Sequence, residues 1–221
     1  MLVIGHRGAA GLAPENSVSS LKAAEGAGAG MVEVDLRMTA DQKVVLMHDP
    51  TLLRTHDDRR KLSDLTLAEV QAVGKREGRE IPELSEFLNE AKVPLNLELK
   101  VQGMEEAVLS AIERFPHRVL ISSHLPPVLK KVRALDGKIQ LGFIIGQRMG
   151  FMFPLMMAVA RQLDLHSIHP IHTLITPAHM KSMRRLGAKV YPWTVNDVHE
   201  FLVLKGLGVD GIFTDYPNII K

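Results

Sequence analysis

The chain has 221 residues, of which 46% are hydrophobic and 24% charged, so it is long enough to bury one substantial core, and one domain spanning 1–221 is expected. The 27 Lys and Arg against 25 Asp and Glu leave a formal charge of +2, and no basic run is interleaved with aromatic residues, which argues against a nucleic-acid binder. The absence of cysteine excludes disulfides, thiolate metal sites and a cysteine nucleophile, so a bound metal must use oxygen or nitrogen ligands.

Short apolar or alternating runs predict eight strands. In chain order they are Leu2–Gly5, Met31–Leu36, Leu95–Leu99, Val119–Ser122, Ile139–Ile144, Ser167–Ile168, Val190–Val195 and Gly211–Phe213. Amphipathic stretches predict helices at Ser17–Ala27, Glu83–Ala91, Met104–Phe115, Pro127–Leu135, Phe151–Leu163, Pro177–Leu186 and Asp197–Leu207, with Asn16 as the first N-cap and Gly187 and Gly208 as C-caps. Because eight strands alternate with helices, we predict a single (β/α)₈ TIM barrel.

Two segments interrupt this alternation. The run Val44–Met47 lies too close behind the second strand to follow a crossover helix, so we predict that it returns antiparallel as a hairpin arm. Residues 50–82 are rich in charge and broken by glycine, which predicts a compact insertion after the second strand, with a short helix at Leu67–Val73. No linker, repeat or low-complexity segment is apparent.

The chain start and the most apolar stretch bear on membrane contact. An apolar run begins directly after Met1 and is interrupted at His6, without preceding cations, which predicts a cytoplasmic location if this is the native start. A membrane span needs about 20 predominantly apolar residues. The stretch 141–160 does not meet this requirement, because it is interrupted by Gln147, Arg148 and Pro154. We therefore interpret it as a buried strand and an apolar helix. The alternative is a segment that touches lipid or a partner surface through Met149, Phe151, Met152, Phe153, Met156 and Met157.

Charged residues alternate with apolar ones on the second and third strands. Glu33 and Asp35 share one face of the second strand, whereas Asn96, Glu98 and Lys100 share one face of the third. In a parallel barrel the helices cover the outside, so we expect the valines and leucines to point outward and the charged residues to point into the barrel mouth.

Three carboxylates in one barrel mouth require compensating cations, because burial of an unpaired carboxylate is strongly disfavoured. Lys100 supplies one positive charge and a hard divalent ion would supply two. Glu33, Asp35 and Glu98 are therefore a candidate site for one divalent cation, Mg²⁺ or Ca²⁺. The alternative is a salt-bridge layer that fills the barrel, with three cationic partners: Arg7, Arg37 and Lys100.

Two histidines fall close to this acidic group. His6 ends the first strand, and His48 ends the hairpin arm, which brings it back beside Asp35. Each histidine alone is more often structural, but together they suit an acid and base pair, because imidazole titrates near neutrality. Arg7 and Lys100 add positive charge suited to a phosphate, so we expect phosphoryl chemistry.

Short motifs follow one another along essentially the whole chain. They are His6-Arg7-Gly8, Pro14-Glu15-Asn16, Glu33-Val34-Asp35, His48-Asp49, Glu98-Leu99-Lys100, Trp193-Thr194-Val195-Asn196 and the closing Gly211-Ile212-Phe213-Thr214-Asp215-Tyr216-Pro217. Each motif is short, but their order and spacing together are specific, and they resemble the glycerophosphodiester phosphodiesterase family. The insertion at residues 50–82 resembles that family's insertion in a compact form.

The resemblance implies a role for each matching residue. Glu33, Asp35 and Glu98 would be the metal ligands, which agrees with the interpretation from strand faces. His6 and His48 would be the general acid and base, and Arg7 and Lys100 the phosphate contacts. The implied reaction is hydrolysis of a small-molecule glycerophosphodiester to sn-glycerol 3-phosphate and an alcohol. In this family the neighbouring glycerol 2-hydroxyl would attack first, giving a cyclic phosphate that water then opens.

Several assignments stay open. There are three rival functions: lysophospholipase D-type activity, a phosphate-ester-binding barrel without turnover, and a barrel that holds Mg²⁺ against an enolate. The sequence indicates no oligomeric state. Trp193 lines the substrate pocket or belongs to the core. His124 stands where relatives usually have phenylalanine and is expected to alter the pocket wall. Glu15 steadies Arg7 or only precedes the helix, and Asp49 supports the turn or His48. Three histidines recur at every third position and either have a substrate role or lie in loops: His166, His169 and His172.

Overall fold

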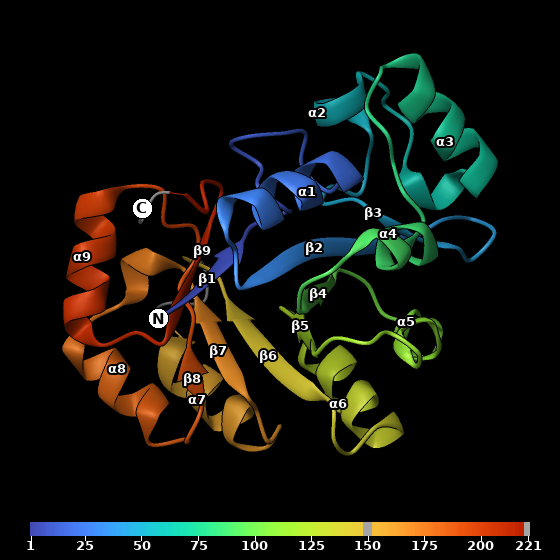
Figure 1. Ribbon diagram of the computed structural model, residues 1–221. Coiled ribbons are helices and arrows are strands. Elements are labelled where there is room, and N and C mark those ends of the chain that lie inside the picture. Colours follow the sequence, from blue (N-terminus) through green and yellow to red (C-terminus); the bar gives the residue numbers. More distant parts are fainter. Residues whose placement is uncertain (148–151, 219–221) are drawn as a thin grey trace.

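Eight parallel strands form a ring at the centre of the computed structural model, which describes residues 1–147 and 152–218. The strands of the ring are β1 (Leu2–Gly5), β2 (Met31–Met38), β4 (Leu95–Leu99), β5 (Val119–Ser123), β6 (Gln140–Ile145), β7 (Ser167–Pro170), β8 (Lys189–Val190) and β9 (Gly211–Thr214). They pair in the order β8-β7-β6-β5-β4-β2-β1-β9. The predicted barrel is confirmed, with helices between its strands (Figure 1).

The ring closes between β8 and β9 through backbone hydrogen bonds. The Asp210 N–H donates to the Val190 carbonyl at 3.0 Å, and the Phe213 N–H donates to that of Pro192 at 2.9 Å. The strand was predicted over Val190–Val195, but the regular part is only Lys189–Val190. Pro192 has no N–H to continue a ladder, although Val195 still donates to Phe213.

Helices connect the strands at nearly the predicted positions. They are α1 (Val18–Ala27), α2 (Leu53–His56), α3 (Leu67–Arg76), α4 (Leu84–Glu90), α5 (Glu105–Ile112), α6 (Pro126–Leu135), α7 (Phe153–Arg161), α8 (Pro177–Arg184) and α9 (Val198–Leu207), with short 3₁₀ helices η1 (Leu62–Asp64) and η3 (His172–Leu174). The predicted N-cap of α1 was wrong by one residue. Ser17 is the cap, because its side chain accepts from the Ser20 N–H, whereas Asn16 has a left-handed backbone with φ of 55°.

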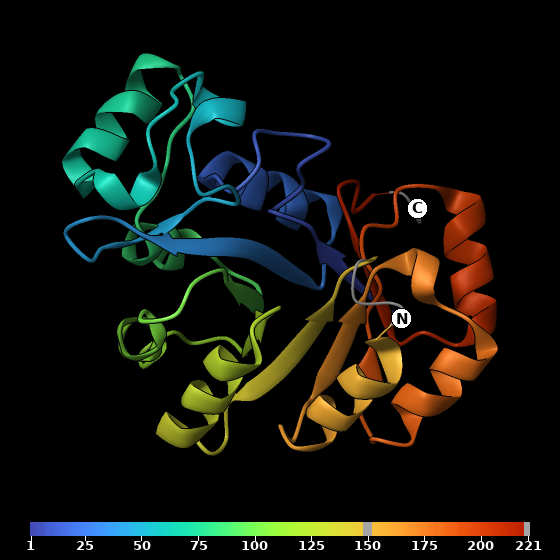
Figure 2. The ribbon, with the colours of Figure 1, turned by 180° about the vertical axis from the view of Figure 1, so that it is seen from behind.

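The predicted hairpin arm is confirmed as β3 (Val44–Leu46), which pairs antiparallel with the end of β2. The insertion that follows has a small core of its own, in which Leu52, Leu62, Val70 and Ile81 are buried. It sits beside α1 and β3 in both views of the ribbon (Figures 1 and 2). Glu80 fixes it there, because its carboxylate accepts the Val18 N–H at the start of α1 at 2.9 Å.

The two faces of the strands have different environments, as predicted. The outward residues of β2 and β4 belong to the main apolar cluster, which also contains the buried faces of the helices. Inside the barrel a small cluster of Ile4, Met31, Leu120, Tyr191 and Phe213 fills the lower part. On β2, Met31 precedes Glu33 and Asp35 on the same face, so this cluster forms a floor beneath the charged residues.

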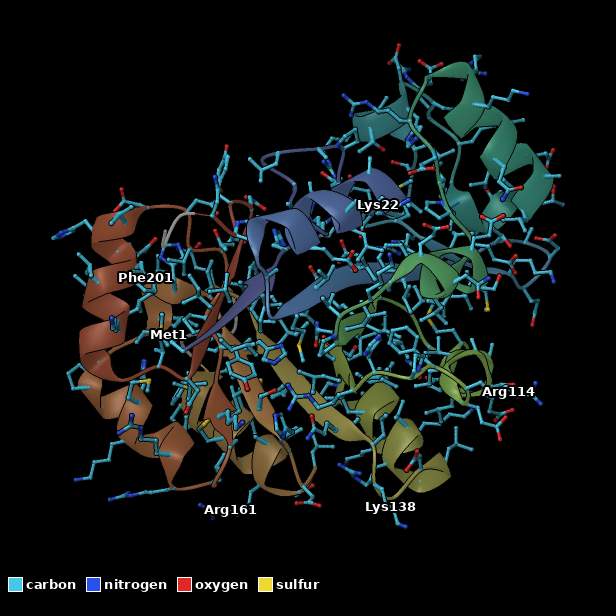
Figure 3. The ribbon with its side chains drawn as sticks, viewed as in Figure 1. Met1, Lys22, Arg114, Lys138, Arg161 and Phe201 are labelled. Atoms are coloured by element: carbon cyan, nitrogen blue, oxygen red, sulfur yellow. The ribbon has the colours of Figure 1, made fainter. Side chains whose placement is uncertain are left out.

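Charged side chains lie at the surface, whereas the methionine- and phenylalanine-rich segment is partly exposed and partly buried. Figure 3 shows Arg114, Lys138 and Arg161 at the edge of the molecule, where all three are exposed. Of the methionine- and phenylalanine-rich segment, Met149 and Phe151 lie outside the described residues, Met152 is 38% exposed, and three side chains are buried: Phe153, Met156 and Met157. Among the described residues, no helix combines the length and the apolar character needed to cross a membrane.

Candidate active site

A cavity of about 50 Å³ opens at the carboxyl ends of the barrel strands. It is lined by His6, Arg7, Glu33, His48, Asn96, Glu98, Lys100, His124, Ile144, His169, Trp193 and Phe213. All the predicted site residues line the cavity except Asp35. Asp35 forms a salt bridge to Lys100, which is itself a lining residue. A wider groove on the outside, between α1, α3 and α4, contains none of them, so we place the candidate site in the barrel cavity.

The three carboxylates form one group because of strand register. Asp35 and Glu98 are direct partners across β2 and β4, and Glu33 lies one step below Asp35 on the same face. Their side-chain oxygens lie within 4.8 Å of one another, and all three residues are buried. Glu33 Oε2 accepts the Arg7 backbone N–H at 2.7 Å, whereas Oε1 is buried and has no hydrogen-bond partner among the described residues. Three hard oxygen donors with one unpartnered oxygen fit a divalent cation.

Two cations already contact this group. Lys100 Nζ lies 2.8 Å from Asp35 Oδ1 and 2.6 Å from Glu98 Oε1, and Arg7 Nε lies 3.3 Å from Asp35 Oδ2. Arg37 does not join them, because its Nε donates to the His48 carbonyl at 2.7 Å. The salt-bridge alternative is therefore present in part, with two cations for three carboxylates. When all three carboxyls are ionised, one negative charge has no cationic partner among the residues that the structure describes.

The pKa values of the carboxyl groups diverge for physical reasons. Burial and the neighbouring Asp35 charge raise the pKa of Glu33 to about 8. Burial also raises the pKa of Glu98 to about 7, against the effect of Lys100. Burial alone would raise the pKa of Asp35 too, but Lys100 and Arg7 hold it below its ordinary value. Near neutrality Glu33 therefore retains its proton and Glu98 is about half protonated, unless further positive charge reaches them.

Each predicted catalytic histidine is hydrogen-bonded to a carboxylate. His6 Nδ1 lies 2.7 Å from Asp215 Oδ1, and His48 Nδ1 lies 2.7 Å from Asp49 Oδ1. A carboxylate accepts from an N–H, so Nδ1 carries the proton in both rings and Nε2 is the free nitrogen. Burial lowers the pKa of His48. The expectation that Asp49 supports His48 is confirmed. The pairing of Asp215 with His6 was not predicted, although Asp215 directly follows the last strand and stands in the closing motif.

The segment before α1 supports the charged residues from behind. Asn16 Nδ2 donates to Asp35 Oδ2 at 2.9 Å, and the Asp35 N–H donates to Asn16 Oδ1 at 2.9 Å. Glu15 accepts from Arg7 Nη1 at 2.9 Å, so the interpretation that it steadies Arg7 is confirmed. The sequence pattern predicted a helix cap at Asn16 and gave no sign of this contact. The left-handed backbone of Asn16, which asparagine tolerates, turns the side chain toward Asp35.

The opposite wall of the cavity is aromatic and uncharged. Trp193 Nε1 donates to the His169 carbonyl at 2.9 Å, and the His124 ring stands edge-on to Trp193 with centroids 5.9 Å apart. Trp193 also packs against the floor cluster, so the pocket and core interpretations both hold. Burial lowers the pKa of His124 to about 4 and that of His169 to about 3, so both rings are neutral near pH 7.

The three spaced histidines have different surroundings. The interpretation of all three as loop residues is wrong for His169, which belongs to β7, faces the barrel interior and is 1% exposed. Gly142 makes room for its ring. His172 on η3 instead pairs with Glu200 of α9, and His166 precedes β7. Neither His166 nor His172 lines the cavity.

Comparisons with known proteins bear on this geometry. The family model described as "Glycerophosphoryl diester phosphodiesterase family" matches residues 6–219. A glycerophosphodiester phosphodiesterase of Caldanaerobacter subterraneus is 31% identical, covering 99% of this chain and 96% of the relative. A rat protein named lysophospholipase D is 26% identical over 99% of this chain and 84% of the relative. A phosphodiesterase structure from Oleispira antarctica, in complex with the product sn-glycerol-3-phosphate, superposes with a TM-score of 0.88 at 29% identity, covering 100% and 95% of the two chains.

Proposed function

The chain belongs to the glycerophosphoryl diester phosphodiesterase family, and we propose that it hydrolyses glycerophosphodiesters to sn-glycerol 3-phosphate and an alcohol, using His6 and His48 as acid and base and one divalent cation, Mg²⁺ or Ca²⁺. The observation that carries the proposal is the meeting of two carboxylate-paired imidazoles with three carboxylates and two cations in one cavity. That combination suits cleavage of a phosphate ester better than binding alone, because a binder has no need of both imidazoles.

Glu33, Asp35 and Glu98 would hold the cation. When bound, a divalent ion supplies positive charge that offsets the charge of the phosphoryl oxygens. Two observations support this donor set. One oxygen of each carboxylate lies within 4.8 Å of the others, and the part of the chain that the structure describes offers buried Glu33 Oε1 no hydrogen-bond partner. The raised pKa values of Glu33 and Glu98 also mark carboxyls whose ionised form lacks sufficient positive charge nearby.

Arg7 and Lys100 would bind the phosphoryl oxygens. Both side chains are largely buried, and their carboxylate partners fix their position before a substrate arrives. Groups held in place in this way need no rearrangement when charge develops during the reaction, which is the condition under which such contacts are most effective. Arg7 adds a planar donor set that suits phosphate oxygens.

The imidazoles would move protons at Nε2. One ring, neutral and unprotonated at Nε2, removes the proton of the attacking hydroxyl. The other ring enters the step as the imidazolium, protonated on both nitrogens, and passes its Nε2 proton to the oxygen of the leaving alcohol. If the glycerol 2-hydroxyl attacks first, as the family resemblance implies, the two roles exchange when water opens the cyclic phosphate. Asp215 and Asp49 would hold the Nδ1 proton of each ring, so that Nε2 is the nitrogen that takes up or releases a proton. The uncharged wall of His124 and Trp193 would face the glycerol or the head group.

The test is release of sn-glycerol 3-phosphate from glycerophosphocholine by the purified protein, first in EDTA and then with added Mg²⁺ or Ca²⁺. We expect no release in EDTA and restored release with metal. An absence of release in every metal would contradict the proposal. Binding of glycerol 3-phosphate without turnover would then favour the phosphate-ester-binding barrel, and turnover of oxo-acids would favour the enolate alternative.

A second candidate substrate is a lysophospholipid. The rat relative named lysophospholipase D and the exposed Met152 and Leu155 at the start of α7 favour it. Release of choline from lysophosphatidylcholine, measured beside glycerophosphocholine, separates the two. A higher kcat/KM for the lysophospholipid would make it the preferred substrate of the same site.

A further inference from the structure

Arg54 lies on α2 of the insertion, outside the cavity, and bridges two carboxylates from separate parts of the chain. Its Nε donates to Asp49 Oδ2 at 2.5 Å. Its Nη1 and Nη2 donate to the two oxygens of Glu15, each at 2.7 Å. Asp49 follows β3, whereas Glu15 precedes α1, so one guanidinium joins three segments.

Each of these carboxylates has its other contact on a cavity residue. Asp49 Oδ1 binds His48 Nδ1 at 2.7 Å, and Glu15 Oε1 binds Arg7 Nη1 at 2.9 Å. Arg54 is therefore one side chain away from both His48 and Arg7. We propose that Arg54 is a positioning residue, through which the insertion holds His48 and Arg7 in register with each other.

The geometry distinguishes this bridge from an ordinary surface ion pair. An isolated exposed pair contributes little, because solvent screens it and both side chains must be ordered. Here the Arg54 side chain is 47% exposed, but those of Glu15 and Asp49 are only 19% and 23% exposed. The contact to Glu15 is bidentate, and Arg54 serves both carboxylates at once. A lysine keeps the charge but lacks the fork, so it cannot reproduce both contacts.

The backbone beneath Arg54 is held firmly enough for such a role. Leu52, two residues earlier, is fully buried in the insertion core. Its N–H donates to the Arg60 carbonyl, and the His56 N–H donates back to the Leu52 carbonyl at 2.8 Å. His56 Nε2 also contacts the Arg79 carbonyl across the insertion at 3.0 Å. The position of α2 is thus set by packing that does not involve Arg54.

The inference rests on the proposed function and is tested with Arg54→Met and Arg54→Lys. Arg60→Met is the matched control. Arg60 is 49% exposed, lies in the same insertion, and pairs with Asp58 rather than with a cavity partner. For Arg54→Met we expect kcat/KM on glycerophosphocholine to fall by about 10- to 100-fold, as for other partners that orient site residues. Arg54→Lys should show a smaller loss. Arg60→Met should stay within about two-fold of the parent. Both Met variants should unfold at similar temperatures.

A double-mutant cycle shows whether Arg54 acts through Asp49. If it does, Arg54→Met should cost much less in an Asp49→Asn background than in the parent, because the linked contact is already lost. Losses that simply multiply would overturn the inference. A parent-like rate for Arg54→Met, or an equal loss for Arg60→Met, would overturn it as well.

A readout that needs no turnover separates this inference from the proposed function. The Nδ1 proton of His48 is followed by NMR and assigned by its disappearance in His48→Gln. We expect the Arg54→Met variant to shift or broaden this resonance, and Arg60→Met to leave it in place. An unchanged resonance in Arg54→Met would reject the positioning role. A parent protein that releases no product would reject the proposed function, and the resonance would still decide the role of Arg54.

Discussion

The roles of the two cavity histidines can be tested by substituting each residue. His6 is 17% and His48 33% exposed, so truncation of either ring leaves no large internal void. His6→Ala and His48→Ala should each lower kcat by about 10²- to 10⁴-fold, the usual contribution of a general acid or base. Steady-state kinetics with glycerophosphocholine measure this. The exposed His199→Ala on α9 serves as the control, and near-parent activity of both cavity variants would refute the assignment.

Asp215, the carboxylate partner of His6, can be tested in the same way. Its Oδ1 binds His6, while Asn196 Nδ2 donates to Oδ2 at 2.6 Å, so the carboxylate is held from both sides. In Asp215→Asn the amide offers one acceptor oxygen, which leaves His6 or Asn196 without its partner and allows the wrong tautomer of the ring. We expect kcat to fall by at least about 10-fold, with a smaller change in KM. Asp136→Asn, far from the cavity, is the control. A loss confined to KM would instead indicate a role in substrate binding.

At the scale of elements, the strands were predictable because their signal is local. The alternation of Glu33, Asp35 and Glu98 with apolar residues has the period of a strand. Helices cover the outside of a parallel barrel, so the apolar face of each strand points outward and the charged face points inward. The direct pairing of Asp35 with Glu98 then follows from two adjacent parallel strands. The acidic group could therefore be predicted from the order of residues along two strands.

The supporting contacts of Asn16, Arg54 and Asp215 were not predicted, because they depend on segments that meet only in the folded chain. Asn16 lies beside a genuine cap residue and looks the same by sequence, but its side chain bonds Asp35. Arg54 is one of several arginines in a charged insertion, and periodicity does not distinguish it from Arg60. Asp215 stood in a recognised motif, yet its partner His6 is 209 residues away.

Gly142 on β6 tests how tightly the barrel interior is filled. A Cβ at this position would lie 2.5 Å from His169 Cε1 and 3.2 Å from Ser122 Cβ. His169 is boxed in by Tyr191 and Phe213, so it has little room to move. Gly142→Ala should lower the free energy of unfolding by about 1–3 kcal/mol, measured by urea denaturation. Gly26→Ala in α1 meets open space and should raise it by about 0.5–1 kcal/mol. Equal stability of Gly142→Ala and the parent would show a looser interior.

At the scale of the whole molecule, the acidic group links folding to pH. In the unfolded chain Glu33 and Glu98 ionise near their ordinary pKa of 4.5, whereas in the fold burial raises these pKa values to about 8 and about 7. The folded state therefore binds more protons across this interval, so the free energy of unfolding without metal should fall as the pH rises. His124 and His169, whose pKa values are lowered, act in the opposite sense only below about pH 6.5. The lowered pKa of Asp35 matters only at still more acid pH.

The same linkage predicts how metal changes stability. Mg²⁺ or Ca²⁺ bound at the proposed site would compete with the protons on Glu33 and Glu98, and an ion that binds only the folded state stabilises it by mass action. From about pH 7 to about pH 9, the midpoint of thermal unfolding should therefore drop in EDTA, and the gain on adding metal should grow. Differential scanning calorimetry at both pH values measures this. Glu98→Gln removes one of the two titrating carboxyls, so it should flatten the pH dependence in EDTA and reduce the gain from metal. A gain that is the same at both pH values, in the parent and in Glu98→Gln alike, would mean that the ion binds elsewhere and that the barrel carboxylates are compensated by Lys100 and Arg7 alone.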